Sequence, residues 1–440
     1  MFIAKKIMDY MRVNIYRAIF VLMNILVIGA FLVGLYAFIV ESPGSCFWEY
    51  SSFEISDWLI NYCGGFVRRG LTGQLLYFAY QIHPYPVRYA ILMLYVVGFL
   101  LVSWMLVRLL KKRGLSVFIL PFTICLYYSF TCDLIWTRRD YWSLLIALAI
   151  YYQYFKFISI SNVISLFIFY VLSAVTLLIH EASIFYTHLI LLLHSVFLTY
   201  KNYEVRNLLR LSLLWLPVLI LFIFIIINKG SENVMTSIWE SWQPCFQTYP
   251  PKSGIIPDVG NGVEFLRRSS YNAIAMHVNL VWLSNFAPYI PSWPFNIYII
   301  VCTYYLVTRI NTIDMKFYKL GYVNKVLLSN IVILQFILLI PMFGFLSCDL
   351  GRVVPYWVIS SLFIYCVTVE SNNSSLVSIP FVSKISAFMQ NKIDGMDFLN
   401  KSWLYCLIIL TLPLNCYYGA TYLGIVPVQY FFKVFKFLCA

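Results

Sequence analysis

Residues 18–40 read AIFVLMNILVIGAFLVGLYAFIV, a run without a charged side chain. A helix needs about 20 apolar residues to cross a membrane, whereas the apolar core of a signal peptide has only about 7–15. Lys5, Lys6 and Arg17 precede the run, and no small-residue cleavage site follows it. We therefore expect residues 18–40 to be an uncleaved signal anchor and the first membrane-spanning helix.

The whole chain shares this apolar character. Of its 440 residues, 62% are hydrophobic and 11% are charged, whereas soluble domains have about 25% charged residues. A water-soluble fold could not bury so many apolar side chains. The basic residues that give the net charge of +13 lie in short turns between apolar runs, and the sequence contains no recognisable nucleic-acid-binding module. The expected partner is therefore the lipid bilayer and not nucleic acid.

The apolar runs predict an all-α, polytopic transmembrane helix bundle with about eleven spans, each of about 20 residues. The expected spans lie near residues 18–40, 89–109, 115–131, 141–157, 162–179, 182–199, 211–228, 293–308, 326–346, 353–369 and 403–425. We interpret residues 1–440 as one membrane domain with two extended outer segments. These are a first outer loop at 41–88 and a long outer loop at 229–292, between spans seven and eight.

The distribution of Lys and Arg predicts a cytoplasmic N-terminus in a bacterial inner membrane. The basic run 111–113 and the turns near 201–210 and 309–325 would then lie inside. Arginine is more prominent than lysine in the outer segments. Lysine and arginine have the same effect on membrane topology. Only arginine, however, has a planar guanidinium that binds two phosphate or carboxylate oxygens at once through two parallel N–H donors. We therefore expect an anion-binding site on the outer face.

The first outer loop holds one candidate site, from Asp57 to Leu71, which reads DWLINYCGGFVRRGL. Arg68 and Arg69 are flanked by apolar residues, so they do not belong to a solvated run of charges. Two interpretations remain open. The pair binds a substrate anion, or the segment lies at the interface and its arginines contact lipid headgroups.

Two tight outer turns carry similar charges. One contains Arg138 and Arg139 followed by Asp140, and the other contains Asp349 and Arg352. Both could bind a substrate. The alternatives are a self-neutralising turn in which Asp140 caps the next helix, and a structural Asp–Arg pair.

His180 and Glu181 lie between two apolar runs with almost no loop. Charged groups at this depth usually face a cavity or a partner, and a buried ion pair is the alternative to a functional role. The motif is not HExxH because position 184 is Ile184, so a metalloprotease is not expected.

The long outer loop contains a third arginine pair, Arg267 and Arg268, together with Trp239 and Trp242. The faces of tryptophan rings can stack on sugars. An aromatic belt at the membrane interface is the alternative.

Together these residues suit a lipid-linked phosphate and a sugar acceptor. The expected binders of a lipid diphosphate are Arg68, Arg69, Arg138, Arg139, Arg267, Arg268 and Arg352. The candidate general bases, which would remove a proton from a sugar hydroxyl, are Asp57, Glu181 and Asp349. No cofactor and no metal ligand set is expected, although a divalent metal stays open.

Three of these motifs carry a family resemblance. Residues 64–71 (GGFVRRGL), His180-Glu181 and residues 349–352 (DLGR) resemble a pattern in polytopic proteins of bacterial surface-polysaccharide loci. The overall build is similar to that of O-antigen polymerases, and the carboxylate in the first loop is similar to that of C-type membrane glycosyltransferases. The chain departs from the C-type pattern because Asp57 lies well after the first span and no paired acidic motif follows.

This resemblance implies an O-antigen polymerase that joins polyprenyl-diphosphate-linked oligosaccharides at the periplasmic face. A chain-length regulator is a candidate protein partner. A side-branch glycosyltransferase with a polyprenyl-phosphate donor is the second hypothesis. A lipid-linked sugar transporter or flippase is the third, although it would need charges within the spans.

Overall fold

A computed structural model describes much of the chain. The described residues are 50, 52–113, 138–201, 205–251, 258–268, 270–283, 285–287, 290–291, 293–309, 324–346, 350–370, 379–396, 404, 407–408 and 411–412. Their regular secondary structure is helical apart from one antiparallel pair of short strands, β1 (Asn285–Ala287) and β2 (Ile290–Pro291).

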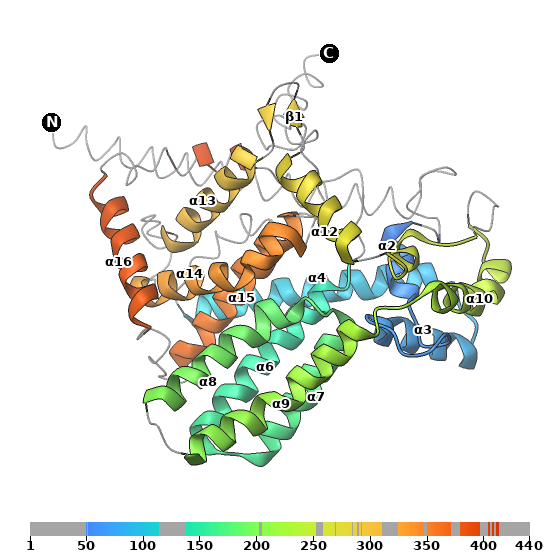
Figure 1. Ribbon diagram of the computed structural model, residues 1–440, viewed down its shortest axis with the longest axis horizontal. Coiled ribbons are helices and arrows are strands. Elements are labelled where there is room, and N and C mark those ends of the chain that lie inside the picture. Colours follow the sequence, from blue (N-terminus) through green and yellow to red (C-terminus); the bar gives the residue numbers. More distant parts are fainter. Residues whose placement is uncertain are drawn as a thin grey trace.

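Most helices form an elongated bundle (Figure 1). Its members are α4 (Val87–Lys112), α6 (Asp140–Ile160), α7 (Val163–Ile179), the π-helix η4 (Ile184–His188), α8 (Leu189–Lys201), α9 (Val205–Ile227), α12 (Ser270–Val278), the π-helix η5 (Asn279–Leu283), α13 (Trp293–Arg309), α14 (Lys325–Pro341), the π-helix η6 (Met342–Leu346), α15 (Leu350–Glu370) and α16 (Pro380–Asp394). At its centre α15 packs against α6 and α14, and α6 also packs against α4 and α7.

Five described helical segments are long and apolar enough to cross a membrane. They are Val87–Lys112, Asp140–Ile160, Leu209–Ile227, Lys325–Leu346 and Arg352–Val369. The expected all-helical class is thus confirmed, and these five segments are candidate spans, whereas the count of about eleven spans stays a prediction. The spans expected at 18–40 and 115–131, and most of 403–425, lie outside the described residues.

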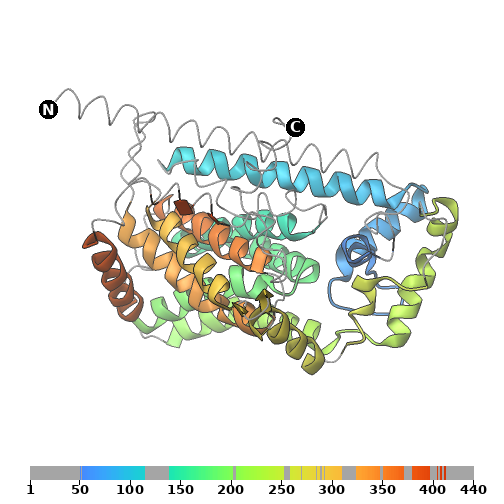
Figure 2. The same ribbon diagram turned by 90° about the horizontal axis from the view of Figure 1, so that it is seen from above.

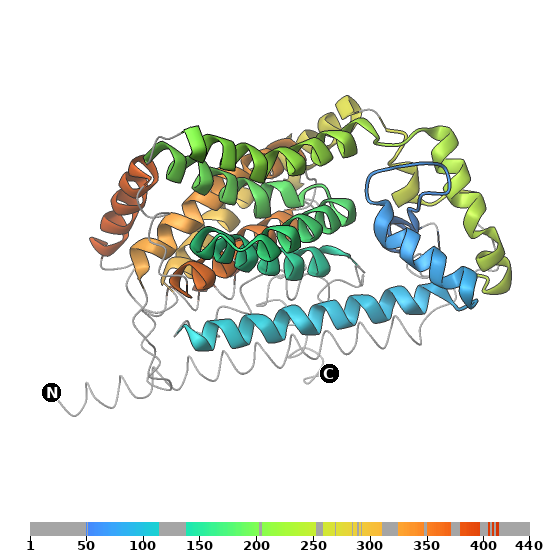
Figure 3. The ribbon, with the colours of Figure 1, turned by 90° about the horizontal axis from the view of Figure 1, so that it is seen from below.

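A smaller unit, which we call the cap, sits at one end of the bundle, beside the start of α4 (Figures 2 and 3). It consists of α2 (Phe53–Ser56), the 3₁₀ helix η2 (Asp57–Leu59), α3 (Gly70–Ile82), α10 (Glu232–Thr248) and α11 (Asn261–Glu264). These elements share their own hydrophobic core, which includes Trp58, Trp239 and Trp242. The described parts of the two segments expected as outer loops are thus largely helical. Helices α2, η2 and α3 of the first segment fold together with α10 and α11 of the second, whereas α12 and η5 belong to the bundle.

Close backbone approach in the cap depends on Gly262. Its amide donates a hydrogen bond of 2.7 Å to Ser56 Oγ. A Cβ atom at Gly262 would lie 2.5 Å from the backbone nitrogen of Asp57, closer than packed atoms allow. Glycine at this position therefore lets α11 pack closely on η2, which carries Asp57.

The helices of the bundle alternate in direction between the cap end and the opposite end, which we call the distal end. The backbone amide of Arg68 donates to the carbonyl of Asn228, just after α9, so the last turn of α9 lies at the cap end. The first turn of α9 therefore lies at the distal end, together with the end of α4 (Figure 3).

Candidate functional site

Five segments that carry charged side chains meet where the cap joins the bundle. They are η2, the turn before α3, the start of α6, the turn between α7 and η4, and the first turn of α15. We call these side chains the arginine–carboxylate cluster: Asp57, Arg68, Arg69, Arg138, Arg139, Asp140, His180, Glu181 and Arg352.

Arg69 and Glu181 form a paired contact between the cap and the bundle. Arg69 Nε donates to Glu181 Oε2 over 2.8 Å, and Arg69 Nη2 donates to Oε1 over 2.7 Å. The backbone of Arg69 is left-handed, with φ at 63°. Such a conformation costs a non-glycine residue about 1–3 kcal/mol and is common at functional sites. The carbonyl of Arg69 accepts a hydrogen bond of 2.7 Å from Arg139 Nη1, which helps to hold this turn.

Asp57 is the most buried carboxylate of the cluster, with only 4% of its side chain exposed. Its Oδ1 is 2.8 Å from Arg139 Nη2 and 3.6 Å from Arg69 Nη1. Burial by itself would raise the pKa of the Asp57 carboxyl, but Arg139 and Arg69 hold that pKa well below its usual range. Asp57 is therefore an ionised carboxylate that neutralises the buried arginines.

Asp140 and Arg352 form a second bidentate pair, in which Arg352 Nε and Nη2 donate to the two carboxylate oxygens, each over 2.9 Å. Arg352 Nη2 also lies 2.8 Å from His180 Nε2. The backbone amide of Ala182 donates to His180 Nδ1 over 3.1 Å, so both ring nitrogens face N–H donors. This arrangement disfavours the protonated imidazolium, although a neutral ring can accept at only one of the two nitrogens. Burial and the nearby Arg69 lower the pKa of His180 to about 3, which keeps the ring neutral.

Arg68 is the most accessible of the cluster's side chains, at 28% exposure. Its Nη1 is 3.6 Å from Glu181 Oε1, and its Nη2 donates to the Phe265 carbonyl over a long 3.5 Å. Its Nε is buried and has no hydrogen-bond partner among the described residues. Arg68 thus offers weakly satisfied donors at an accessible edge, next to Glu181, whose side chain is 17% exposed.

The cluster is electropositive. It combines five guanidinium groups with three carboxylates and a neutral imidazole, which leaves a net charge of about plus two. Burial favours the neutral form of Glu181, yet Arg69 and Arg68 hold its pKa well below the ordinary value. Within the described residues no three His, Cys, Asp or Glu side chains come together as a metal site. The arrangement can bind an oxyanion, and Glu181 can accept a proton beside it.

The other residues expected at the site make different contacts. Arg267 Nη2 is 2.9 Å from Glu264 at the cap surface, and the Arg268 guanidinium stacks on Phe265 at 4.0 Å. Asp349 lies outside the described residues.

Trp239 and Trp242 are buried in the cap core, and Trp242 Nε1 donates to the Leu59 carbonyl over 2.8 Å. In this structure, therefore, neither ring offers a free face for stacking on a sugar.

Three further side chains, Asp140, His180 and Thr72, contact the residues expected at the site. The sequence indicates a helix cap as one of two roles for the turn at Asp140, and in the structure this carboxylate pairs with Arg352. His180 contacts Arg352, and Thr72 Oγ1 accepts a hydrogen bond of 2.6 Å from Arg139 Nη1. Asp140 and His180 belong to two of the charged turns described from the sequence, beside Arg139 and Glu181, and their place in these turns is the signal that the sequence offers.

No protein-family model, curated protein or solved structure matches the chain.

Proposed function

We propose that the protein transfers glycosyl groups between polyprenyl-diphosphate-linked oligosaccharides at the periplasmic face of a bacterial inner membrane, most simply as an O-antigen polymerase. The proposal includes about eleven spans, a cytoplasmic N-terminus and a cap on the periplasmic side. The observation that carries it is the contact of Arg68 and Arg69 with Glu181 at the accessible edge of an electropositive cluster.

Arg68 and Arg69 are the proposed diphosphate binders. Arg68 can donate directly to phosphate oxygens, whereas the Arg69 donors that face Glu181 become available only when the phosphate displaces that carboxylate. Arg139 and Arg352 contribute mainly to the local potential, because Asp57 and Asp140 already occupy them. The cluster has about two positive charges in excess. A diphosphate carries more negative charge than a monophosphate and therefore compensates this excess better. This charge match favours the polymerase over the side-branch transferase.

Glu181 is the proposed general base, since Asp57 is almost completely buried. In the reaction, a hydroxyl of the acceptor sugar attacks the anomeric carbon of the donor and Glu181 takes its proton. The bond between that carbon and the phosphate oxygen breaks, and the polyprenyl diphosphate leaves with the electron pair. A diphosphate that binds Arg69 would weaken the Arg69–Glu181 pair, which raises the basicity of Glu181 only when the donor is present.

Deletion of the gene tests the class of reaction. For a polymerase, electrophoresis of the lipopolysaccharide should show lipid A core with at most one repeat unit. A normal ladder with altered composition would instead establish the side-branch transferase. A normal and unaltered ladder would eliminate both enzymes and leave transport.

Binding to the purified, full-length protein tests the site directly. Farnesyl diphosphate should raise the melting temperature more than farnesyl monophosphate does, and Arg68→Gln should remove this difference. Arg267→Gln is the matched control, because it removes a cation from the cap surface. In cells, Glu181→Gln should eliminate the ladder without loss of farnesyl diphosphate binding. A full ladder from Glu181→Gln would refute the assignment of the base.

A further inference from the structure

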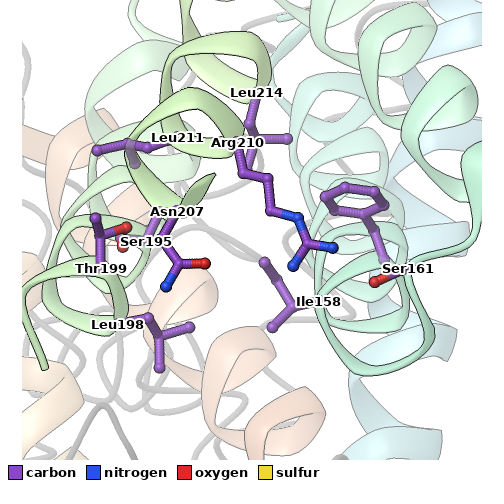
Figure 4. Close-up of a pocket in the computed structure, with 10 residues that line it drawn as sticks. Ile158, Ser161, Ser195, Leu198, Thr199, Asn207, Arg210, Leu211 and Leu214 are labelled. Atoms are coloured by element: carbon purple, nitrogen blue, oxygen red, sulfur yellow. Dashed lines mark hydrogen bonds between the residues drawn. The ribbon is translucent and has the colours of Figure 1, made fainter. Parts of the chain in front are cut away.

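A pocket lies at the distal end of the bundle, far from the cluster in the fold. It has a volume of about 200 Å³ and lies between the last turns of α6 and α8 and the first turns of α9. Its lining consists of Phe157, Ile158, Ser161, Ser195, Leu198, Thr199, Asn207, Arg210, Leu211 and Leu214. Figure 4 shows the Arg210 side chain extending from α9 into the pocket, towards the side that carries Ser161 and Ile158.

The polar part of this lining suits a phosphate group. Arg210 supplies the only charge among the described lining residues, so the pocket is cationic. A guanidinium binds phosphate oxygens through two parallel N–H donors, and the Asn207 amide and the Ser161 hydroxyl can add further hydrogen bonds.

The apolar part requires a ligand that also has hydrocarbon. Phe157, Leu198 and Leu214 line the pocket beside its polar groups. Next to it, α9 exposes Leu209 and Leu213, at 60% and 68%. These side chains lie on a helix that is apolar enough to cross a membrane, so their exposed face is the one that lipid would cover.

We infer that this pocket binds the phosphate headgroup of an anionic membrane phospholipid, with the acyl chains along the exposed face of α9. Basic pockets between membrane helices bind such headgroups. The occupant is a lipid and not a free phosphate ester, for two reasons. Half of the residues that line the pocket are apolar, and the pocket adjoins the exposed apolar face of α9. This site is independent of the proposed glycosyl transfer.

The test measures the melting temperature of the full-length protein, purified in a neutral detergent. Addition of dioleoyl phosphatidylglycerol should raise it by at least about 3 °C more than addition of dioleoyl phosphatidylcholine does. Arg210→Gln should eliminate this difference. Arg206→Gln should keep it, because Arg206 is exposed one turn earlier on α9 and does not line the pocket.

A second variant keeps the test informative if Arg210→Gln does not fold. Leu198→Trp fills the pocket without a change of charge, and it should also eliminate the response to phosphatidylglycerol. An undiminished response in Arg210→Gln or in Leu198→Trp would overturn the inference. So would an equal response to glycerol 3-phosphate, because the pocket would then bind a soluble phosphate ester.

Discussion

The contact between Arg139 and Asp57 is the most deeply buried ion pair among the described residues, since the Arg139 side chain has no exposed surface. Removal of one partner of a buried pair leaves the other charge without compensation, and such changes cost about 3–5 kcal/mol. We therefore expect Arg139→Gln to lower the free energy of unfolding by about this amount. Chemical unfolding of the purified protein in detergent measures it.

Two comparisons separate this effect from a general loss of charge. Arg267→Gln breaks a pair at the cap surface, where the Arg267 side chain is 46% exposed, and it should cost about 1 kcal/mol or less. The double variant Asp57→Asn/Arg139→Gln should recover part of the loss, because no buried charge is left alone. If Arg139→Gln were as stable as Arg267→Gln, the buried pair would not stabilise the junction of cap and bundle.

His180 gives the cluster a pH dependence of defined sign. The folded protein lowers the pKa of its imidazole to about 3, whereas the unfolded chain has a pKa of about 6.5. Between these values only the unfolded chain binds the proton, so stability falls as the pH drops below about 6.5. The groups that face the ring are Arg69, Arg352, Asp140 and Glu181.

The variant His180→Gln should lose less stability than the unmodified protein when the pH falls from 7.5 to 5, values chosen to span an unfolded pKa of about 6.5. Melting temperatures at the two pH values measure this difference. Asp57 and Glu181 have lowered pKa values, so their contributions are lost only at more acidic pH and leave this window unchanged. Parallel pH profiles of the two proteins would show that the folded ring titrates normally.

Helix α3 lies close to the backbone of the preceding segment at Gly73. A Cβ atom at this position would collide with the carbonyl group of Ile60, which cannot move as a flexible side chain can. Gly73→Ala should therefore cost about 1–3 kcal/mol, by analogy with overpacked cores. The melting temperature of the purified protein measures this loss.

Gly344→Ala in η6 is the matched control for Gly73→Ala, because the added Cβ would meet no described atom within 4 Å. It should leave the melting temperature nearly unchanged. Equal effects of the two substitutions would mean that α3 can shift away from Ile60 at little cost.

The helices were predictable from the sequence to a larger extent than the contacts of the cluster were. Apolar runs of span length define α4, α6 and α14 because a membrane helix must satisfy its backbone internally and expose apolar side chains. The contact of Asp140 with Arg352 joins residues 212 positions apart, and that distance in sequence hides it from any local pattern.

The cap shows the same limit for aromatic residues. Sequence composition does not distinguish a tryptophan in a small core, such as Trp242, from one at the membrane interface. The difference arises because α3 and α10, from two distant segments, fold together and cover its ring. The sequence predicted arginine pairs at the outer face, and the fold determines which of them belong to one cluster.

Basic residues lie at both ends of the molecule, but arginines at the cap end such as Arg69, Arg139 and Arg352 are paired with carboxylates. Lys111 and Lys112 end α4 at the distal end, and Arg206 and Arg210 begin α9 there. Cytoplasmic ends of membrane helices are enriched in Lys and Arg. We therefore expect the distal end to be cytoplasmic and the cap, with its cluster, to be periplasmic.

Reporter fusions and thiol labelling test this orientation. The expected cytoplasmic fusion sites are Lys112, Arg206 and Met315, and the expected periplasmic sites are Tyr50, Ser253 and Leu350. Cys63 is an exposed free thiol among the described residues of the cap, so a membrane-impermeant maleimide should label the protein in spheroplasts, and the labelling should fall in Cys63→Ser. Periplasmic signals at two of the three cytoplasmic sites would reverse the orientation. The cluster would then face the cytoplasm, where it could not join oligosaccharides on the outer leaflet.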